Sequence, residues 1–156
     1  MRLLVTTAAL GVLCLTSTAS ASFQFTMSGL TVNTAVAKSS LAVTATNVPD
    51  RPTIFSLSNV GDSITMDLFS LSVNGTGNGQ VSVDFHFSQP VLSTGSGAKG
   101  GGFVGNISNG MITWGNPNSM TFGSNSDGIL EISLSNGPVT AGPIQGTFTL
   151  QAQPSV

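Results

Sequence analysis

The residues best suited to chemistry are Asp84 and His86, which stand two apart in an alternating run, and His86 is the only histidine. Residues two apart in a strand share a face, so the carboxylate and the imidazole would lie side by side. Such a pair suits proton transfer or one corner of a metal site, and with a nucleophile it would make a hydrolase. The Gly-x-Ser-x-Gly pattern of a serine nucleophile is absent. Alternation also explains both residues as a solvated face opposite Val83 and Phe85, and we expect a protein that is not an enzyme.

A second group of oxygen-bearing side chains comprises Asn125, Asp127 and Glu131. Calcium prefers such ligands, and loops of secreted proteins often supply them. The Asp-x-Asp-x-Asp-Gly spacing is missing, and Asp127 before Gly128 is also a typical turn residue. No cofactor is expected apart from calcium at this site.

Trp114 is the only tryptophan, and tyrosine is absent. With Asn116 and Asn118 it would form a glycan-binding surface, because aromatic faces stack on sugar rings. The alternation of residues 111–114 instead puts Trp114 on the same face as Ile112, which favours the core. Both interpretations remain open at this point.

Glycine-rich residues 93–102 carry two matches to the dinucleotide-binding pattern, one at residues 95–100 and one at residues 100–105. That pattern requires a helix N-terminus to hold a pyrophosphate. No helix is predicted here, so both matches are attributed to chance in an exposed glycine- and serine-rich loop.

The elements that position these residues are strands. Residues 60–90 hold two alternating runs on either side of the turn at residues 74–79, whose glycines and asparagines favour antiparallel pairing. The first run changes phase at Leu68 and Phe69, which predicts a bulge or a strand that crosses between sheets. The second run buries every other residue.

Similar short runs continue along the chain, about ten in all, including residues 23–27, 30–36, 103–107 and 130–134. Their spacing predicts an all-β fold, an antiparallel two-sheet β-sandwich of jelly-roll or Greek-key type. Residues 23–27 carry neither charge nor proline, so we expect an edge strand there that permits self-association.

Residues 1–21 have the features of a signal peptide: Arg2 at the start, an apolar stretch, and a small-x-small site for cleavage after Ala21. The only cysteine, Cys14, falls inside it. We therefore expect a secreted or extracellular single domain over residues 22–156. The chain has four basic residues against six acidic ones, which argues against nucleic acid as a partner. No second apolar span is present, so no membrane span is expected in the mature chain.

Several stretches together resemble exported bacterial proteins of the PEP-CTERM type. They are Val60-Gly61-Asp62-Ser63, Val81-Ser82-Val83-Asp84-Phe85-His86-Phe87 ending at Pro90, Gly110-Met111-Ile112-Thr113-Trp114 and Gly146-Thr147-Phe148-Thr149-Leu150. The Pro-Glu-Pro sorting tail of that family is not seen. The resemblance implies a non-enzymatic protein of an extracellular or cell-surface matrix, associated with biofilm and exopolysaccharide, and it supplies no catalytic residues. Partners would be extracellular polysaccharide or other copies of the chain.

Overall fold

The computed structural model of the protein describes residues 22–36, 40–90 and 99–155, and these contain strands and no helix. The strands pair antiparallel throughout and follow the chain in the order β1 (Phe23–Val36), β2 (Ala42–Thr46), β3 (Thr53–Leu57), β4 (Ser63–Asn74), β5 (Gly79–Gln89), β6 (Lys99–Ser108), β7 (Met111–Trp114), β8 (Asn118–Phe122), β9 (Gly128–Leu134), β10 (Gly137–Pro138) and β11 (Ile144–Ala152).

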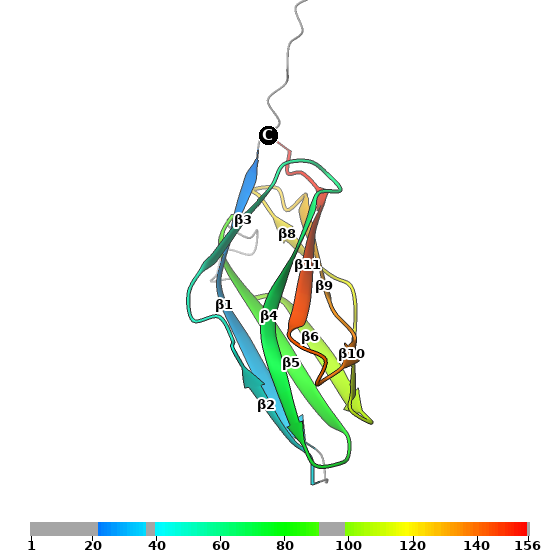
Figure 1. Cartoon of the computed structure of the whole chain (residues 1–156). Helices are drawn as coiled ribbons and strands as arrows, with labels where there is room; N and C mark the ends of the chain where they lie inside the picture. Colours follow the sequence, from blue (N-terminus) through cyan, green and yellow to red (C-terminus); the bar gives the residue numbers. More distant parts are fainter. Residues whose placement is uncertain (1–21, 37–39, 91–98, 156) are drawn as a thin grey trace, which may run out of the picture.

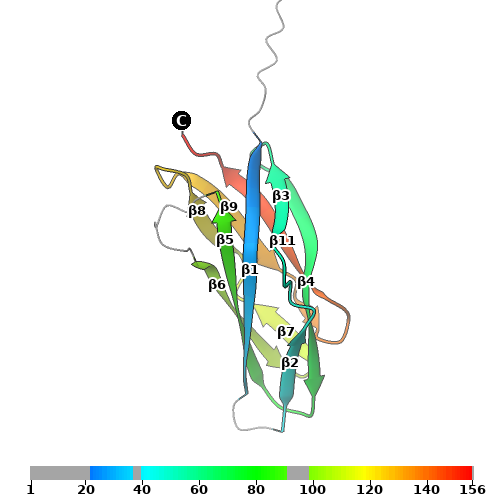
Figure 2. The same ribbon diagram turned by 90° about the vertical axis from the view of Figure 1, so that its left-hand side faces the viewer.

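The strands form two sheets packed face to face (Figures 1 and 2). One has six strands in the order β10-β7-β6-β5-β1-β3, and the other has five in the order β2-β4-β11-β9-β8. The predicted antiparallel two-sheet β-sandwich is therefore confirmed. The chain passes between the sheets repeatedly, which places residues far apart in sequence on one sheet face.

The phase change predicted in the first long run is a β-bulge in β4. Phe69 pairs with Ile144 of β11 and Asp67 pairs with Gln145, so Leu68 is the extra residue between them. Leu68 and Phe69 are both buried as a result, being 2% and 1% exposed. Beyond the bulge β4 pairs with β2, so the bulge lies where the strand changes partner.

β1 differs from the sequence interpretation. It is one strand with register shifts between Thr26 and Gly29, where two short strands were expected. Its first part, residues 23–27, pairs with β3, and from Thr26 onward it also pairs with β5. The expectation of an edge strand over residues 23–27 is therefore wrong for Thr26 and Met27, which pair with β3 on one side and β5 on the other, whereas residues 23–25 pair with β3 alone. The glycine-rich loop was also drawn too long: β6 already begins at Lys99, and residues 93–98 lie outside the described residues.

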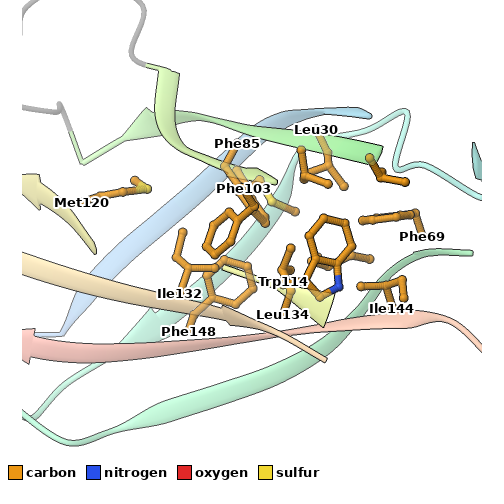
Figure 3. Close-up of a cluster of buried hydrophobic side chains, with 14 of the residues drawn as sticks. Leu30, Phe69, Phe85, Phe103, Trp114, Met120, Ile132, Leu134, Ile144 and Phe148 are labelled. Atoms are coloured by element: carbon orange, nitrogen blue, oxygen red, sulfur yellow. The ribbon is translucent and has the colours of Figure 1, made fainter. Parts of the chain in front are cut away.

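The core between the sheets is entirely apolar among the described residues. Phe148 lies near its centre, with ring centroids of Phe55, Phe85 and Phe87 at 5.0, 5.8 and 6.4 Å. Each such ring removes roughly 150–250 Å² from water, so the aromatic cluster is a major part of the stabilising burial. Figure 3 shows this cluster continuing to Phe69 and Trp114.

Both ends of the sandwich chain lie at one pole (Figure 1). The start of β1 pairs with the end of β3, as Phe23 faces Leu57. After β11, Gln153 Nε2 donates a hydrogen bond of 2.7 Å to the carbonyl of Ser58, which follows β3. The opposite pole carries the β4–β5 and β6–β7 turns.

Candidate functional site

The outer face of the six-stranded sheet carries two of the candidate residues, Asp84 and His86. In β5 the buried residues alternate with Gln80, Ser82, Asp84 and His86, whose side chains therefore point outward. Register places β1 on one side of them and β6 on the other. The polar side chains of this outer face include Thr31, Asn33, Gln80, Ser82, Asp84, His86, Asn106, Ser108 and Thr113. Among the side chains described on this outer face, Asp84 is the one carboxylate, and none is a phenylalanine, tyrosine or tryptophan.

His86 makes its hydrogen bond to β1. Its Nε2 lies 3.1 Å from Thr31 Oγ1, and its carbonyl oxygen accepts a 3.1 Å bond from Ser28 Oγ. No hydrogen bond joins His86 to Asp84 within the described chain. Asp84 has Thr31 and Gly102 as its cross-strand neighbours, and glycine leaves room for the carboxylate. The pair is therefore part of a half-buried polar surface, with Thr31 as the hydroxyl next to the imidazole.

An open hollow of about 480 Å³ lies at the opposite pole from the start of β1 and the end of β11, where β1 and β6 end and β5 begins. We call it the amide hollow, because Asn78, Gln80 and Asn106 line it, with Ala35, Gly79, Ile107 and Ser108 completing its described wall. Gln80 Nε2 donates to Asn106 Oδ1 at 3.2 Å across the strand pair. The hollow contains no charged side chain among these residues.

Two exposed apolar residues adjoin the amide hollow on β6 and β7. Val104 is 49% exposed and Met111 is 46% exposed. On β6, Asn106 stands between Val104 and Ser108, and Ser108 pairs with Met111. An amide is thus flanked by aliphatic surface on this outer face, which has a further exposed aliphatic residue, Ile54, at β3.

Trp114 belongs to the core. It is 4% exposed, its Nε1 donates a 3.1 Å hydrogen bond to the carbonyl of Ser135, and its ring meets Phe69 edge-on with centroids 6.3 Å apart (Figure 3). The glycan-binding surface built on Trp114 is therefore a wrong interpretation, since the indole has no accessible face to offer a sugar. The alternation with Ile112, which is also buried, indicated the core correctly.

Asn116 and Asn118 hold the β7–β8 connection in place. Asn116 mimics a paired strand, because its Nδ2 donates to the Leu134 carbonyl at 2.6 Å and its Oδ1 accepts from the Leu134 N–H at 2.8 Å. Asn118 Nδ2 donates to the carbonyl of Gly102 at 2.8 Å and so joins β8 to β6. Asn116 uses both its amide nitrogen and its oxygen on the fold, and with Trp114 buried the predicted surface of Trp114, Asn116 and Asn118 does not form.

Asp127 and Asn125 bind the C-terminal segment. Both the N–H and the Oγ of Ser155 donate to Asp127 Oδ2, and Asn125 Nδ2 donates to Ser155 Oγ at 3.0 Å. These bonds, the Ser155 hydroxyl first, hold the pKa of Asp127 below its usual value. Glu131 lies on β9 opposite Thr149 and Ser119.

Two of the proposed calcium ligands, Asp127 and Asn125, are engaged by Ser155, and calcium binding by the three residues stays a prediction. No cluster of three or more histidine, cysteine, aspartate or glutamate side chains suited to a metal occurs in the described part of the chain. Asp127 and Asn125 fasten residue 155, and Glu131 stands on a strand. The position of Asp127 before Gly128 at a turn agrees with the other interpretation of this residue.

Asp62 has a similar structural role in the β3–β4 turn. Its Oδ2 accepts from the N–H groups of Asn59 and Ser58 at 2.9 and 3.1 Å. These backbone donors, Asn59 first, lower the pKa of Asp62. Its own carbonyl accepts a 3.0 Å bond from the N–H of Leu150, so the turn is fastened to β11.

The amide hollow was not predicted from sequence. Its wall combines β1, the β4–β5 turn, β5 and β6, and only the register Ala35–Gln80–Asn106 brings these residues together. The signal that existed was the outward position of Gln80 in the alternating run. Nothing local in the sequence pairs it with Asn106.

Comparison of the chain with protein-family models, with curated proteins and with solved structures gives no match. Within the described residues, no helix is long and apolar enough to span a membrane. Fold and surface together define an antiparallel β-sandwich whose described interior is apolar and whose six-stranded sheet has a mainly polar outer face among the described side chains.

Proposed function

We propose that the protein is a secreted, non-enzymatic β-sandwich of an extracellular or cell-surface matrix. It contacts matrix polymers through the outer face of its six-stranded sheet. The observation that carries this proposal is the composition of that face: hydroxyl and amide side chains around one carboxylate–imidazole pair. Such a face forms many weak hydrogen bonds to a hydrated polymer and has no grouping fitted to one reaction.

The arrangement of Asp84 and His86 supports a binding role over the hydrolase alternative. A hydrolase needs the imidazole to bond its nucleophile and to be oriented by the carboxylate. Here the imidazole bonds Thr31, which is exposed on an open sheet face, and no bond to Asp84 orients it. Retention of any hydrolytic activity of the preparation in His86→Ala would speak for the binding role.

Co-sedimentation of the protein with extracellular matrix material tests the proposal. Asn33→Arg and Ser82→Arg place bulky cations on the outer face of the six-stranded sheet, and we expect them to reduce the bound fraction severalfold. Thr65→Arg and Thr147→Arg are matched controls, because these two hydroxyls, 2.9 Å apart, occupy the outer face of the other sheet.

No association of the wild type, or equal losses in both sets of variants, would contradict the proposal.

Self-association is the second mode that we propose, now through sheet edges other than residues 23–27. β2, β3 and β8 are the candidates, because each is an outer strand of its sheet and carries neither charge nor proline. Light scattering over a concentration series checks it: a mass that stays monomeric throughout contradicts it.

A further inference from the structure

We propose that the amide hollow and the adjoining strip of β6 and β7 bind an uncharged polysaccharide. This inference rests on the proposed function and names the ligand class and the place where it binds. A hollow of about 480 Å³ falls within the ~300–1,000 Å³ common for small-molecule sites, so it accommodates a short segment of a chain of sugars.

The hydrogen-bonding groups of the amide hollow suit sugar hydroxyls. Each hydroxyl is both a donor and an acceptor, and a carboxamide offers both kinds of group from one side chain. The single bond between Gln80 and Asn106 uses one N–H and one oxygen. Gln80 Oε1 and Asn106 Nδ2 therefore remain to accept from and donate to a ligand. Asn78 and Ser108 add two more dual-capacity groups on the same wall.

The same bond between Gln80 and Asn106 also prepares the site. It fixes both side chains across the strand pair before any ligand arrives, which reduces the entropy lost on binding. The strands beneath hold the amides at a defined separation, because the paired positions are set by register. A rigid element gives a more exact site than a loop does.

The exposed aliphatic residues complement the other part of a sugar. A pyranose ring presents C–H groups on its faces and hydroxyls at its rim, so a binding surface needs both apolar and polar groups. Val104 and Met111, about half exposed, stand on either side of Asn106 along the outer face. They supply apolar contact without the aromatic stacking first expected from Trp114.

Charge decides which polysaccharide fits. The described lining of the amide hollow has neither a cation nor an anion. A polyuronate or a nucleic acid would lose hydration there without gaining a counter-charge. Along β5 the nearest carboxylate, Asp84, stands four residues from Gln80, and it repels an anionic polymer. A neutral glycan has no charge to dehydrate and is not repelled by Asp84.

Binding of purified polymers to the full protein tests this inference. Dextran, laminarin and galactomannan serve as neutral probes and alginate as the anionic one, with affinity measured by titration and gel retardation. We expect at least one neutral glycan to bind and alginate to bind at least tenfold more weakly. Gln80→Ala and Asn106→Ala should each weaken binding roughly fivefold to tenfold, the effect of losing one to two net hydrogen bonds.

Gln145→Ala is the matched control. Gln145 also makes an exposed cross-strand hydrogen bond, in which its Nε2 donates to Asp67 Oδ1 at 2.9 Å, but it lies on the outer face of the other sheet. Its removal should leave glycan affinity within twofold. Backbone amide shifts of the wild type provide a second readout, and glycan should perturb residues 78–80 and 104–111 first.

The inference is overturned if no neutral glycan binds, if alginate binds more tightly, or if Gln145→Ala weakens binding as much as Asn106→Ala. Shift changes that avoid the amide hollow would overturn it as well. Co-sedimentation with matrix separates this failure from that of the proposed function. A protein that still associates with matrix material, while no neutral glycan binds, keeps the proposed function and loses this ligand.

Discussion

Replacing Gly105 by alanine should destabilise the protein, because the added Cβ would collide with the indole ring of Trp114. An ideal Cβ at Gly105 would stand 2.6 Å from Trp114 Cε3, 2.7 Å from Cζ3 and 3.0 Å from Ile112 Cδ1. Contacts that short require a shift of the indole or of β6. The indole cannot move freely, since it is 4% exposed and its Nε1 is bonded to the Ser135 carbonyl.

The expected magnitude follows from overpacking. One extra methyl group in a filled core costs about 1–3 kcal/mol, against a typical total stability of about 5–15 kcal/mol. We place Gly105→Ala in the upper half of that range, because two of the three close atoms belong to a rigid ring. Relief by shifting the ring would lengthen the bond to the Ser135 carbonyl, which adds to the cost.

Urea unfolding followed by tryptophan fluorescence measures this effect directly, because Trp114 is the only tryptophan. The matched control is Gly115→Ala, where the added Cβ would lie 3.9 Å from the Val104 carbonyl, an ordinary contact. That control should leave stability within about 1 kcal/mol, or raise it by restricting the unfolded chain. Wild-type stability in Gly105→Ala, with unchanged tryptophan emission, would refute the packing argument.

Three further outcomes are expected. Asn116→Ala should cost about 1–3 kcal/mol in urea unfolding, because it leaves the N–H and C=O of Leu134 without partners; a neutral effect would mean that water replaces the amide. Phe148→Ala should cost about 3–5 kcal/mol by opening a cavity in the aromatic cluster, and a loss below 1 kcal/mol in thermal unfolding would contradict the packing described. Asp127 has a pKa below 3.8 when folded because Ser155 donates to it, so its contribution is complete above 3.8 and is lost as pH falls through the lower, folded value. The protection of the Ser155 amide, measured as its exchange rate relative to an unstructured peptide at the same pH, should therefore fall in acid, and less so in Asp127→Asn; protection that stays constant with pH in the wild type would count against the contact.

The fold could be predicted in large part because alternation is a local property. The run at residues 80–87 buries Val81, Val83, Phe85 and Phe87 as expected. The double burial at Leu68 and Phe69 marked the bulge, since an apolar pair at adjacent positions fits a sandwich only where the strand changes phase. The same alternation placed Trp114 on one face of its strand with Ile112, and both residues are buried.

What was missed depends on pairing between distant residues. Residues 23–27 have the composition of an exposed edge, but β3 covers them from thirty residues further along the chain. Asn116 and Asn118 have the composition of a sugar-binding loop, yet they bond to Leu134 and Gly102. A polar side chain that satisfies a backbone group and one that faces a ligand are indistinguishable until the register is known.

The two chain ends at one pole determine what a fusion partner or an anchoring surface would meet. β1 runs from that pole to Ala35 at the amide hollow, roughly 40 Å away at the usual rise of about 3.3 Å per strand residue. A label, a bead or a neighbouring domain joined at residue 22 or residue 155 would therefore attach at the pole opposite the hollow. For this reason, binding measurements on immobilised protein should attach it at that pole.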